Sequence, residues 1–286
     1  MPNVTVITDS VATLPPQLAQ QMGVVVVPER LTLGETSYRD GDLSLEEVVS
    51  RIDEGFTTSG PSPGDFLGAL EAGGGEAGAL IITVSRELAS STYESAHTAA
   101  RLHPLPVEVL DSGTAAGAQG LVVAAAAAVA ARGEPLHAVV DEARHVADRV
   151  RLIARLDDLS WLARGGHVPY LAARAGDMVG VRPLVEVRNG RVHAMRPALS
   201  VETASERLLA IWRSSKPLEQ AKLHIAGLHA LGSEEAVRLL EVVRSEVVPE
   251  TEFIGYFGTV MVVHSGPSLT GIAWWWDTRY RAGIDL

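Results

Sequence analysis

Two neighbouring hydroxyl side chains, Thr58 and Ser59, precede a predicted helix start. Ser62 suits the N-cap of that helix, Pro63 its first position, and Asp65 lies where a carboxylate would complete a shortened capping box. The hydroxyls of Thr58 and Ser59 are not needed for this capping. A loop with spare donors at a helix N-terminus can hold an anion. The alternative is a surface turn whose hydroxyls are solvated.

A second group of hydroxyls, Ser90, Ser91 and Thr92, follows a predicted buried strand over residues 79–84. These hydroxyls either contribute to an anion site or serve as an N-cap cluster for a helix predicted over residues 94–102. The strand that precedes them is one of several that end in polar residues. In open α/β sheets, ligands bind at the carboxyl ends of the strands.

His264 ends an apolar run over residues 260–263 that predicts a strand. It is either a partly buried histidine bonded to the backbone or an imidazole that the strand delivers to a cleft, where it can donate to an anion. Convergence of Ser90 and His264 on one cleft would also fit a nucleophile and its base. This second arrangement predicts an acyl-ester hydrolase as an alternative function.

The sequence matches two catalytic or cofactor motifs, but each match lies in the wrong structural context. Residues 73–78 match the dinucleotide pattern G-x-G-x-x-G, but they close a predicted helix instead of opening one. Residues 60–64 match G-x-S-x-G, but Pro63 lacks the N–H that an oxyanion hole would need. The sequence has no Walker A or H-E-x-x-H motif, and its nine histidines show no metal spacing. We therefore expect no metal and no cofactor.

Composition sets the broad class of the protein. With 286 residues and 47% apolar content, the chain suits two globular domains, and its net charge of −11 disfavours nucleic acid or an anionic membrane as partner. The absence of cysteine is compatible with the cytoplasm, which we expect as the location. Residues 4–9 lack signal-peptide features. The alanine-rich residues 115–131 predict a buried core helix, so we expect no stable membrane insertion.

The order of the elements predicts an α/β fold of two domains. In residues 1–150, helices alternate with continuously apolar strands, which indicates a parallel sheet covered on both faces. These strands are predicted at residues 4–8, 24–27, 79–84 and 107–110. Residues 31–39 predict a short hairpin. Residues 151–286 predict an α+β domain with a mixed or antiparallel sheet, in which Asn189 and Gly190 form a hairpin turn.

The ordered set of motifs resembles the DegV family of bacterial fatty-acid-binding proteins. It spans nearly the whole chain and consists of Thr8-Asp9-Ser10, Thr58-Ser59 with Pro61-Ser62, the segment 85–96, Asp111-Ser112, Arg164-Gly165-Gly166, Arg182-Pro183 and His264-Ser265-Gly266-Pro267. The resemblance implies two domains that enclose one long-chain fatty acid, with its acyl tail in a buried tunnel. The carrier itself catalyses nothing known in the family. The resemblance further implies that such a carrier presents the acid to a separate ATP-dependent fatty acid kinase for acyl-phosphate formation.

The resemblance also implies the head-group residues. Thr58 and His264 match the carboxylate-binding threonine and histidine, and Ser90 is matched to the carboxylate-binding serine. Ser59 and Ser91 are secondary candidates, and Ser91 could replace Ser90 because the segment from Ser85 is one residue longer than usual.

Two further departures from the family pattern affect cationic residues. His167 stands where the family has arginine after two glycines. The arginine that usually follows the hairpin has no match in register, since Arg196 is only near. Because of these departures, the sequence does not establish whether the surface that docks the kinase is intact. A binder of a phosphorylated small molecule is a third possible function.

Overall fold

The first sheet consists of four parallel strands in the order β2-β1-β6-β7. The computed structural model describes residues 3–164 and 181–279. The strands of this sheet are β1 Thr5–Asp9, β2 Val24–Val27, β6 Ala79–Thr83 and β7 Val107–Asp111. The central strands β1 and β6 are buried along their whole length. This agrees with the predicted parallel sheet.

Helices cover both faces of the first sheet. Ile7 and Ile81 pack on one face against α3 (Pro63–Gly73) and α4 (Ser90–Leu102). Because side chains alternate along a strand, neighbouring residues such as Leu80 point to the opposite face. The opposite face packs with three helices, α1 Pro16–Gln21, α5 Ala116–Ala131 and α6 Leu136–Ala147.

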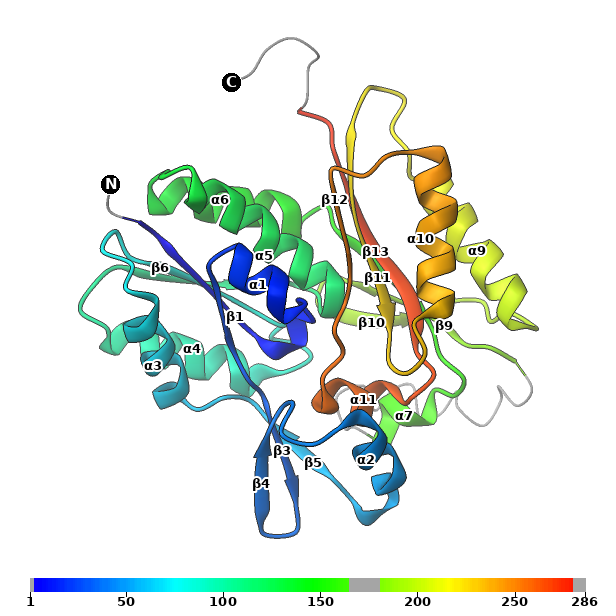
Figure 1. Cartoon of the computed structure of the whole chain (residues 1–286), viewed down its shortest axis with the longest axis horizontal. Helices are drawn as coiled ribbons and strands as arrows, with labels where there is room; N and C mark the ends of the chain where they lie inside the picture. The colour runs from blue at the N-terminus through cyan, green and yellow to red at the C-terminus, as the bar shows by residue number, and fades with distance from the viewer. Residues whose placement is uncertain (1–2, 165–180, 280–286) are drawn as a thin grey trace.

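The alanine-rich helix α5 lies between the two main sheets (Figure 1). Twelve of its sixteen residues are buried, which confirms the predicted core helix. Small side chains permit close approach on both sides of it. A Cβ atom on Gly117 would lie 2.6 Å from the Leu228 side chain of the second sheet, and one on Gly120 would lie 2.7 Å from the Ala12 carbonyl of the first part.

The second sheet has six strands in the order β10-β9-β8-β13-β11-β12. These strands are β8 Arg151–Arg155, β9 Leu184–Arg188, β10 Arg191–Ala194, β11 Lys222–His229, β12 Thr251–Ile254 and β13 Thr270–Asp277. Only the β11–β12 pair is parallel among the pairs of this sheet, so the predicted mixed sheet is confirmed. Asn189 and Gly190 both have positive φ angles, 50° and 77°, in the predicted hairpin turn.

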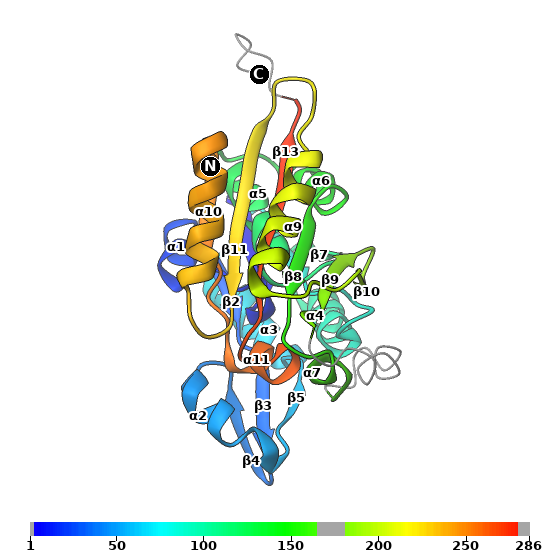
Figure 2. The same cartoon turned by 90° about the vertical axis from the view of Figure 1, so that its right-hand side faces the viewer.

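The two faces of the second sheet have different partners. Trp274 packs with α9 (Val201–Ser214) and α10 (Glu234–Glu246), which Figure 2 shows in front of the sheet. Trp275, the next residue, belongs to the core shared with α5. The face toward α5 therefore joins this sheet to the first part of the chain.

A third, smaller sheet was only partly predicted. The hairpin of β3 (Arg30–Leu33) and β4 (Thr36–Arg39) was expected, but β3 also pairs with β5 (Thr57–Ser59), which the sequence suggested was a loop. This sheet and α2 (Leu45–Ser50) lie beside α11 (Thr259–Ser265) and α7 (Ser160–Arg164) at the bottom of Figures 1 and 2. The N-cap Ser62 and the capping box with Asp65 form as predicted.

The predicted strand that ends at His264 is wrong, since α11 (Thr259–Ser265) is a helix. A short apolar run is compatible with either structure, so its tertiary partners decide. The Asp40 carboxylate accepts a hydrogen bond from the Val260 N–H in the first turn, at 3.2 Å. The helix then stops at Gly266, whose φ of 76° suits glycine.

Two other boundaries bear on the site. Helix α4 begins at Ser90, four residues before the predicted start, and its N-cap position is Ala89 without any side-chain cap. The change from the first sheet to the second falls between α6 and β8, in the region where the boundary near residue 150 was expected. The division into domains 1–150 and 151–286 stays a prediction.

The hairpin turn at Gly190 docks on the first part of the chain. Its N–H donates to the Gly113 carbonyl at 2.7 Å, and its own carbonyl accepts from the Ser85 hydroxyl at 3.1 Å. A Cβ atom on Gly190 would lie only 2.8 Å from the Ser85 oxygen. At Gly34, which also has a positive φ, a Cβ atom would meet nothing within 4 Å.

We expect Gly190→Ala to destabilise the protein more than Gly34→Ala. The control substitution should cost about 1 kcal/mol through backbone strain alone. Gly190→Ala should cost about 2–4 kcal/mol, because the clash with Ser85 adds to that strain. Urea unfolding of both variants measures the difference. Equal losses would show that docking of this turn does not contribute to stability.

Candidate functional site

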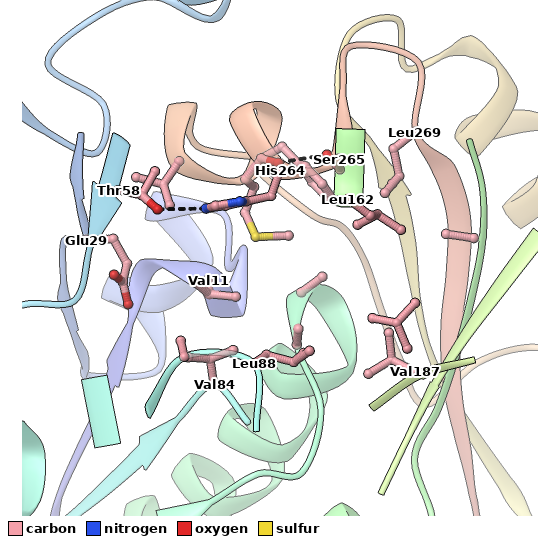
Figure 3. A pocket seen from close by; sticks show the side chains of 18 of the residues that line it. Val11, Glu29, Thr58, Val84, Leu88, Leu162, Val187, His264, Ser265 and Leu269 are labelled. Atoms are coloured by element: carbon pink, nitrogen blue, oxygen red, sulfur yellow. Dashed lines mark hydrogen bonds between the residues drawn. The ribbon is translucent and has the colours of Figure 1, made fainter. Parts of the chain in front are cut away.

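A cavity lies between the second sheet, the carboxyl ends of the first sheet, β5 and α11. Its polar wall is formed by Glu29, Thr58, Ser59, Ser91, His264 and Ser265. Most of the other lining residues are apolar, and among them are Leu152, Ala154, Leu156, Val185, Val187, Val192, Leu228 and Leu269 from the second sheet and its connections. Figure 3 shows Glu29, Thr58 and His264 on its left side and Val187 and Leu269 on its right. The cavity is thus amphipathic.

Thr58 and His264 meet directly at the polar wall. The Thr58 hydroxyl and the His264 Nε2 atom are 2.7 Å apart, although the residues are separated by 206 positions in sequence (Figure 3). Thr58 is held by pairing of β5 with Leu31 of β3. Leu31 is fully buried with Val260 of α11, so one small core positions both members of the pair.

Asp40 fixes the start of α11. Its carboxylate accepts from the Thr259 hydroxyl at 3.0 Å, the Val260 N–H at 3.2 Å and the Ser10 hydroxyl at 2.6 Å. Gly258 approaches this carboxylate so closely that a Cβ atom there would overlap it. Asp40 therefore links β4, the end of β1 and the helix that carries His264.

The serine candidates occupy different positions. Ser59 and Ser91 line the cavity and are also exposed, so the polar wall reaches the surface of the molecule. Ser90 is exposed and is not among the residues that line the cavity. The structure therefore brings Ser91, not Ser90, to the wall that contains Thr58 and His264. The roles of both serines in ligand binding stay predictions.

Sequence reasoning missed the buried acid Glu29 in the cavity wall. The residue is only 4% exposed, and one carboxyl oxygen accepts from the Thr92 hydroxyl at 2.8 Å. Burial, together with the nearby carboxyls of Asp9 and Asp40, raises the pKa of Glu29 well above its ordinary value. The signal in the sequence was an acid between two predicted strands, which alone does not indicate burial.

Asp9 positions two apolar parts of the wall. Its carboxylate accepts from the N–H of Val11, in the short helix η1 (Ser10–Ala12), and from the N–H of Val84, which follows β6. Gln119 of α5 donates to the same carboxylate at 3.1 Å. Burial raises the pKa of Asp9 to about 6, although these hydrogen bonds act in the opposite direction.

Arg182 and Arg196 are not among the described residues that line the cavity. Arg182 forms an ion pair with Asp157 at 3.5 Å, and Arg196 is exposed. Gly165, Gly166 and His167 lie outside the described residues. In the ranges 3–164 and 181–279, no group of acids and histidines has the geometry to hold a metal ion, and no helix is long and apolar enough to cross a membrane.

Sequence comparison extends over nearly the whole chain. A model of the family described as "Uncharacterised protein, DegV family" matches residues 3–276. A DegV domain-containing protein of Streptomyces coelicolor is 29% identical over 276 residues, which cover 94% of this chain and 97% of the relative. Protein DegV of Bacillus subtilis is 28% identical over 285 residues, with coverage of 95% and 99%.

Solved structures match over a similar extent. A DegV family protein from Thermus thermophilus, described for its fatty acid binding, has a TM-score of 0.87 and 28% identity, and the match covers 96% of this chain and 99% of that protein. DegV from Bacillus subtilis, described as a fatty acid binding protein, has a TM-score of 0.82 and 26% identity, with coverage of 97% and 100%. The two-sheet architecture is therefore shared with these proteins.

We expect Asp40→Ala to lower the free energy of unfolding by about 3 kcal/mol, because a carboxylate that accepts three hydrogen bonds is lost. It should also change the NMR chemical shifts of the His264 ring, since α11 loses its anchor.

The exposed Asp42 is a matched control, because its carboxylate accepts from the Arg39 N–H at 2.7 Å within the turn that follows β4. Asp42→Ala should cost less than about 1 kcal/mol and leave the His264 ring signals in place. Unchanged His264 signals in Asp40→Ala would contradict the anchoring role.

Proposed function

Because the chain belongs to the DegV family, we propose that its cavity binds one long-chain fatty acid. The observation that carries this proposal is the amphipathic cavity, in which Thr58 and His264 lie in the polar wall and most of the other lining residues are apolar. The fatty acid binding of the Thermus thermophilus and Bacillus subtilis relatives supports it. In this arrangement the cavity is the acyl tunnel between the two parts of the chain.

The carboxylate binds at the polar wall. Thr58 and His264 present a hydroxyl and an imidazole to the same space, and Ser59 and Ser91 add hydroxyls at its exposed edge. Charge-assisted hydrogen bonds of this kind offset the cost of removing a carboxylate from water. Ser91 takes the role for which Ser90 was the first candidate, since it is Ser91 that lines the cavity.

The acyl tail lies against the apolar face of the second sheet. Leu152, Val187 and Leu228 come from three strands of that sheet and line the cavity together. Each buried methylene contributes about 0.8 kcal/mol, so the tail supplies most of the affinity, less the cost of ordering it. An apolar wall of this extent disfavours a phosphorylated small molecule, whose surface is largely polar.

An acyl-ester hydrolase is less well supported. It requires a nucleophile beside the imidazole, and the Nε2 atom of His264 bonds the Thr58 hydroxyl instead of that of Ser90. Ser90 does not line the cavity. A non-catalytic carrier uses the same hydroxyl and imidazole simply as hydrogen-bonding partners of the bound acid.

The partner of the carrier is a separate ATP-dependent fatty acid kinase. The resemblance to the family motivates this part of the proposal, and the exposed Ser59 and Ser91 place the polar end of the cavity within reach of a docked enzyme. An acid bound with its carboxylate at this edge can be phosphorylated without leaving the protein.

Organic extraction of the purified protein, followed by mass spectrometry, should yield about one long-chain fatty acid per chain. Repeating the extraction after incubation with a purified fatty acid kinase and ATP should show conversion of the bound acid to its acyl phosphate. An empty cavity at saturating lipid would reject the carrier function. Bound acid that no such kinase converts would reject only the proposed partner.

Thr58→Val should weaken fatty acid binding by about ten- to a hundredfold, because one hydrogen bond to a charged group is lost at nearly unchanged volume. Thr57→Val is the matched control, since Thr57 is exposed and does not line the cavity. Equilibrium titration with a fluorescent fatty acid measures both. Equal affinities of the two variants would remove Thr58 from the head-group site.

A further inference from the structure

Glu29 shares a face of the small sheet with Thr58. Leu31 pairs with Thr58 across β3 and β5, and Arg30 pairs with Ser59. Glu29 directly precedes β3, and its carbonyl accepts from the Asp40 N–H at 2.8 Å, which extends the β3–β4 pairing by one residue. Because side chains alternate along an extended chain, Glu29 and Leu31 point to the same side, which is the side of Thr58. Both Glu29 and Thr58 line the cavity, and Figure 3 shows them next to each other.

The Glu29 carboxyl is held in place from α4. The buried Thr92 hydroxyl donates to it at 2.8 Å, and Gly60 packs directly on Thr92, where a Cβ atom would lie 2.6 Å from the hydroxyl oxygen. The Glu29 backbone is fixed as well, since its N–H donates to the Ser10 hydroxyl at 3.1 Å. These hydrogen bonds fix both the carboxyl group and the backbone of Glu29 in the cavity wall.

The charged groups around Glu29 are mostly acids. Asp9 at the end of β1 and Asp40 after β4 act on it electrostatically, and both disfavour its ionised form. Arg30, its neighbour in sequence, pairs instead with Asp65 of α3 at 2.9 Å. On α11, His264 lines the same cavity.

No lysine or arginine is among the described residues that line the cavity. A carboxylate ligand therefore brings a negative charge beside Glu29, and the described part of the wall supplies no lysine or arginine to balance it. Two ionised carboxyls in one buried space repel each other strongly, and one of them takes up a proton instead. The burial and surroundings that raise the pKa of Glu29 make it the group that holds this proton.

We infer that Glu29 is part of the head-group site and acts there as a neutral carboxylic acid that donates its O–H to the ligand carboxylate. This inference rests on the proposed function. Binding of a fatty acid anion is then accompanied by uptake of one proton wherever free Glu29 is ionised. The proton comes from solvent and forms the O–H bond of the Glu29 carboxyl, and no other covalent bond changes. The bound pair then carries one negative charge shared by two carboxyls.

The test measures proton uptake during binding by isothermal titration calorimetry in buffers with different ionisation enthalpies. The ligands are laurate and lauryl alcohol, which share a chain length, titrated from about pH 5 to about pH 9. In wild type we expect uptake that approaches one proton for laurate, with affinity falling by up to about tenfold per pH unit. For lauryl alcohol, affinity should vary much less with pH.

Glu29→Gln should retain laurate binding, because its amide can still donate to the ligand and accept from Thr92, but it should lose this proton uptake. Glu76→Gln, at an exposed position outside the cavity, is the matched control and should behave as wild type. His264→Gln should weaken binding and retain the uptake that depends on Glu29, which separates the two titratable groups in the wall.

Equal proton uptake by wild type and Glu29→Gln would overturn the inference and leave fatty acid binding intact. A folded Glu29→Gln protein that binds no laurate at any pH would also overturn the inference, since the glutamine amide is still a neutral donor. If that variant does not fold, wild type decides, because equal uptake for the acid and the alcohol contradicts the inference. Failure of wild type to bind any long-chain fatty acid would instead reject the proposed function.

Discussion

The hydrogen bond between Thr58 and His264 is the contact on which the polar wall of the cavity depends. It joins a strand of the small sheet to a helix near the end of the chain, 206 residues away. Neither residue could reach the other without the core that packs Leu31 against Val260, or without the Asp40 carboxylate that fixes the start of α11. The small sheet is thus needed for the site, because it brings Thr58 to His264.

The apolar part of the cavity depends on α5. This helix fills the space between the two main sheets for most of its length, and its small side chains allow close approach from both sides. At its N-terminus, Ala115 and Ala116 line the cavity instead of filling it. Ala116 has a φ of 52°, a left-handed conformation that costs about 1 kcal/mol or more outside glycine. The helix that packs between the two main sheets therefore has its N-terminus at the cavity.

Much of the fold could be predicted from local sequence. The parallel sheet, the core helix, the capping box at Ser62 and the hairpin turn at Asn189 and Gly190 follow from patterns that neighbouring residues impose, and the family resemblance is confirmed. The α11 helix was missed because a run of valines favours a strand by propensity, while the distant Asp40 decides the outcome.

The site was predictable only where a motif pointed to it. Thr58 and His264 were predicted and lie together. Ser90 and Ser91 differ by one position at a helix start, and which of them lines the cavity depends on where α4 begins. Glu29 carries no local signal, because its burial comes from Thr92, Gly60 and the end of β1, all distant in sequence.

The described part of the wall has no lysine or arginine, so the charge of the proposed carboxylate ligand must be balanced in another way. Hydroxyls and an imidazole stabilise the anion by hydrogen bonds, but they leave its net charge in place unless the imidazole is protonated. A neutral acid such as Glu29 adds a donor and allows the proton to be shared, so the bound pair carries one negative charge instead of two. Without a permanent cation among the described lining residues, a bound carboxylate would stay accessible as a nucleophile for the kinase proposed above. An arginine in the same place would bind the anion more tightly and make it less reactive.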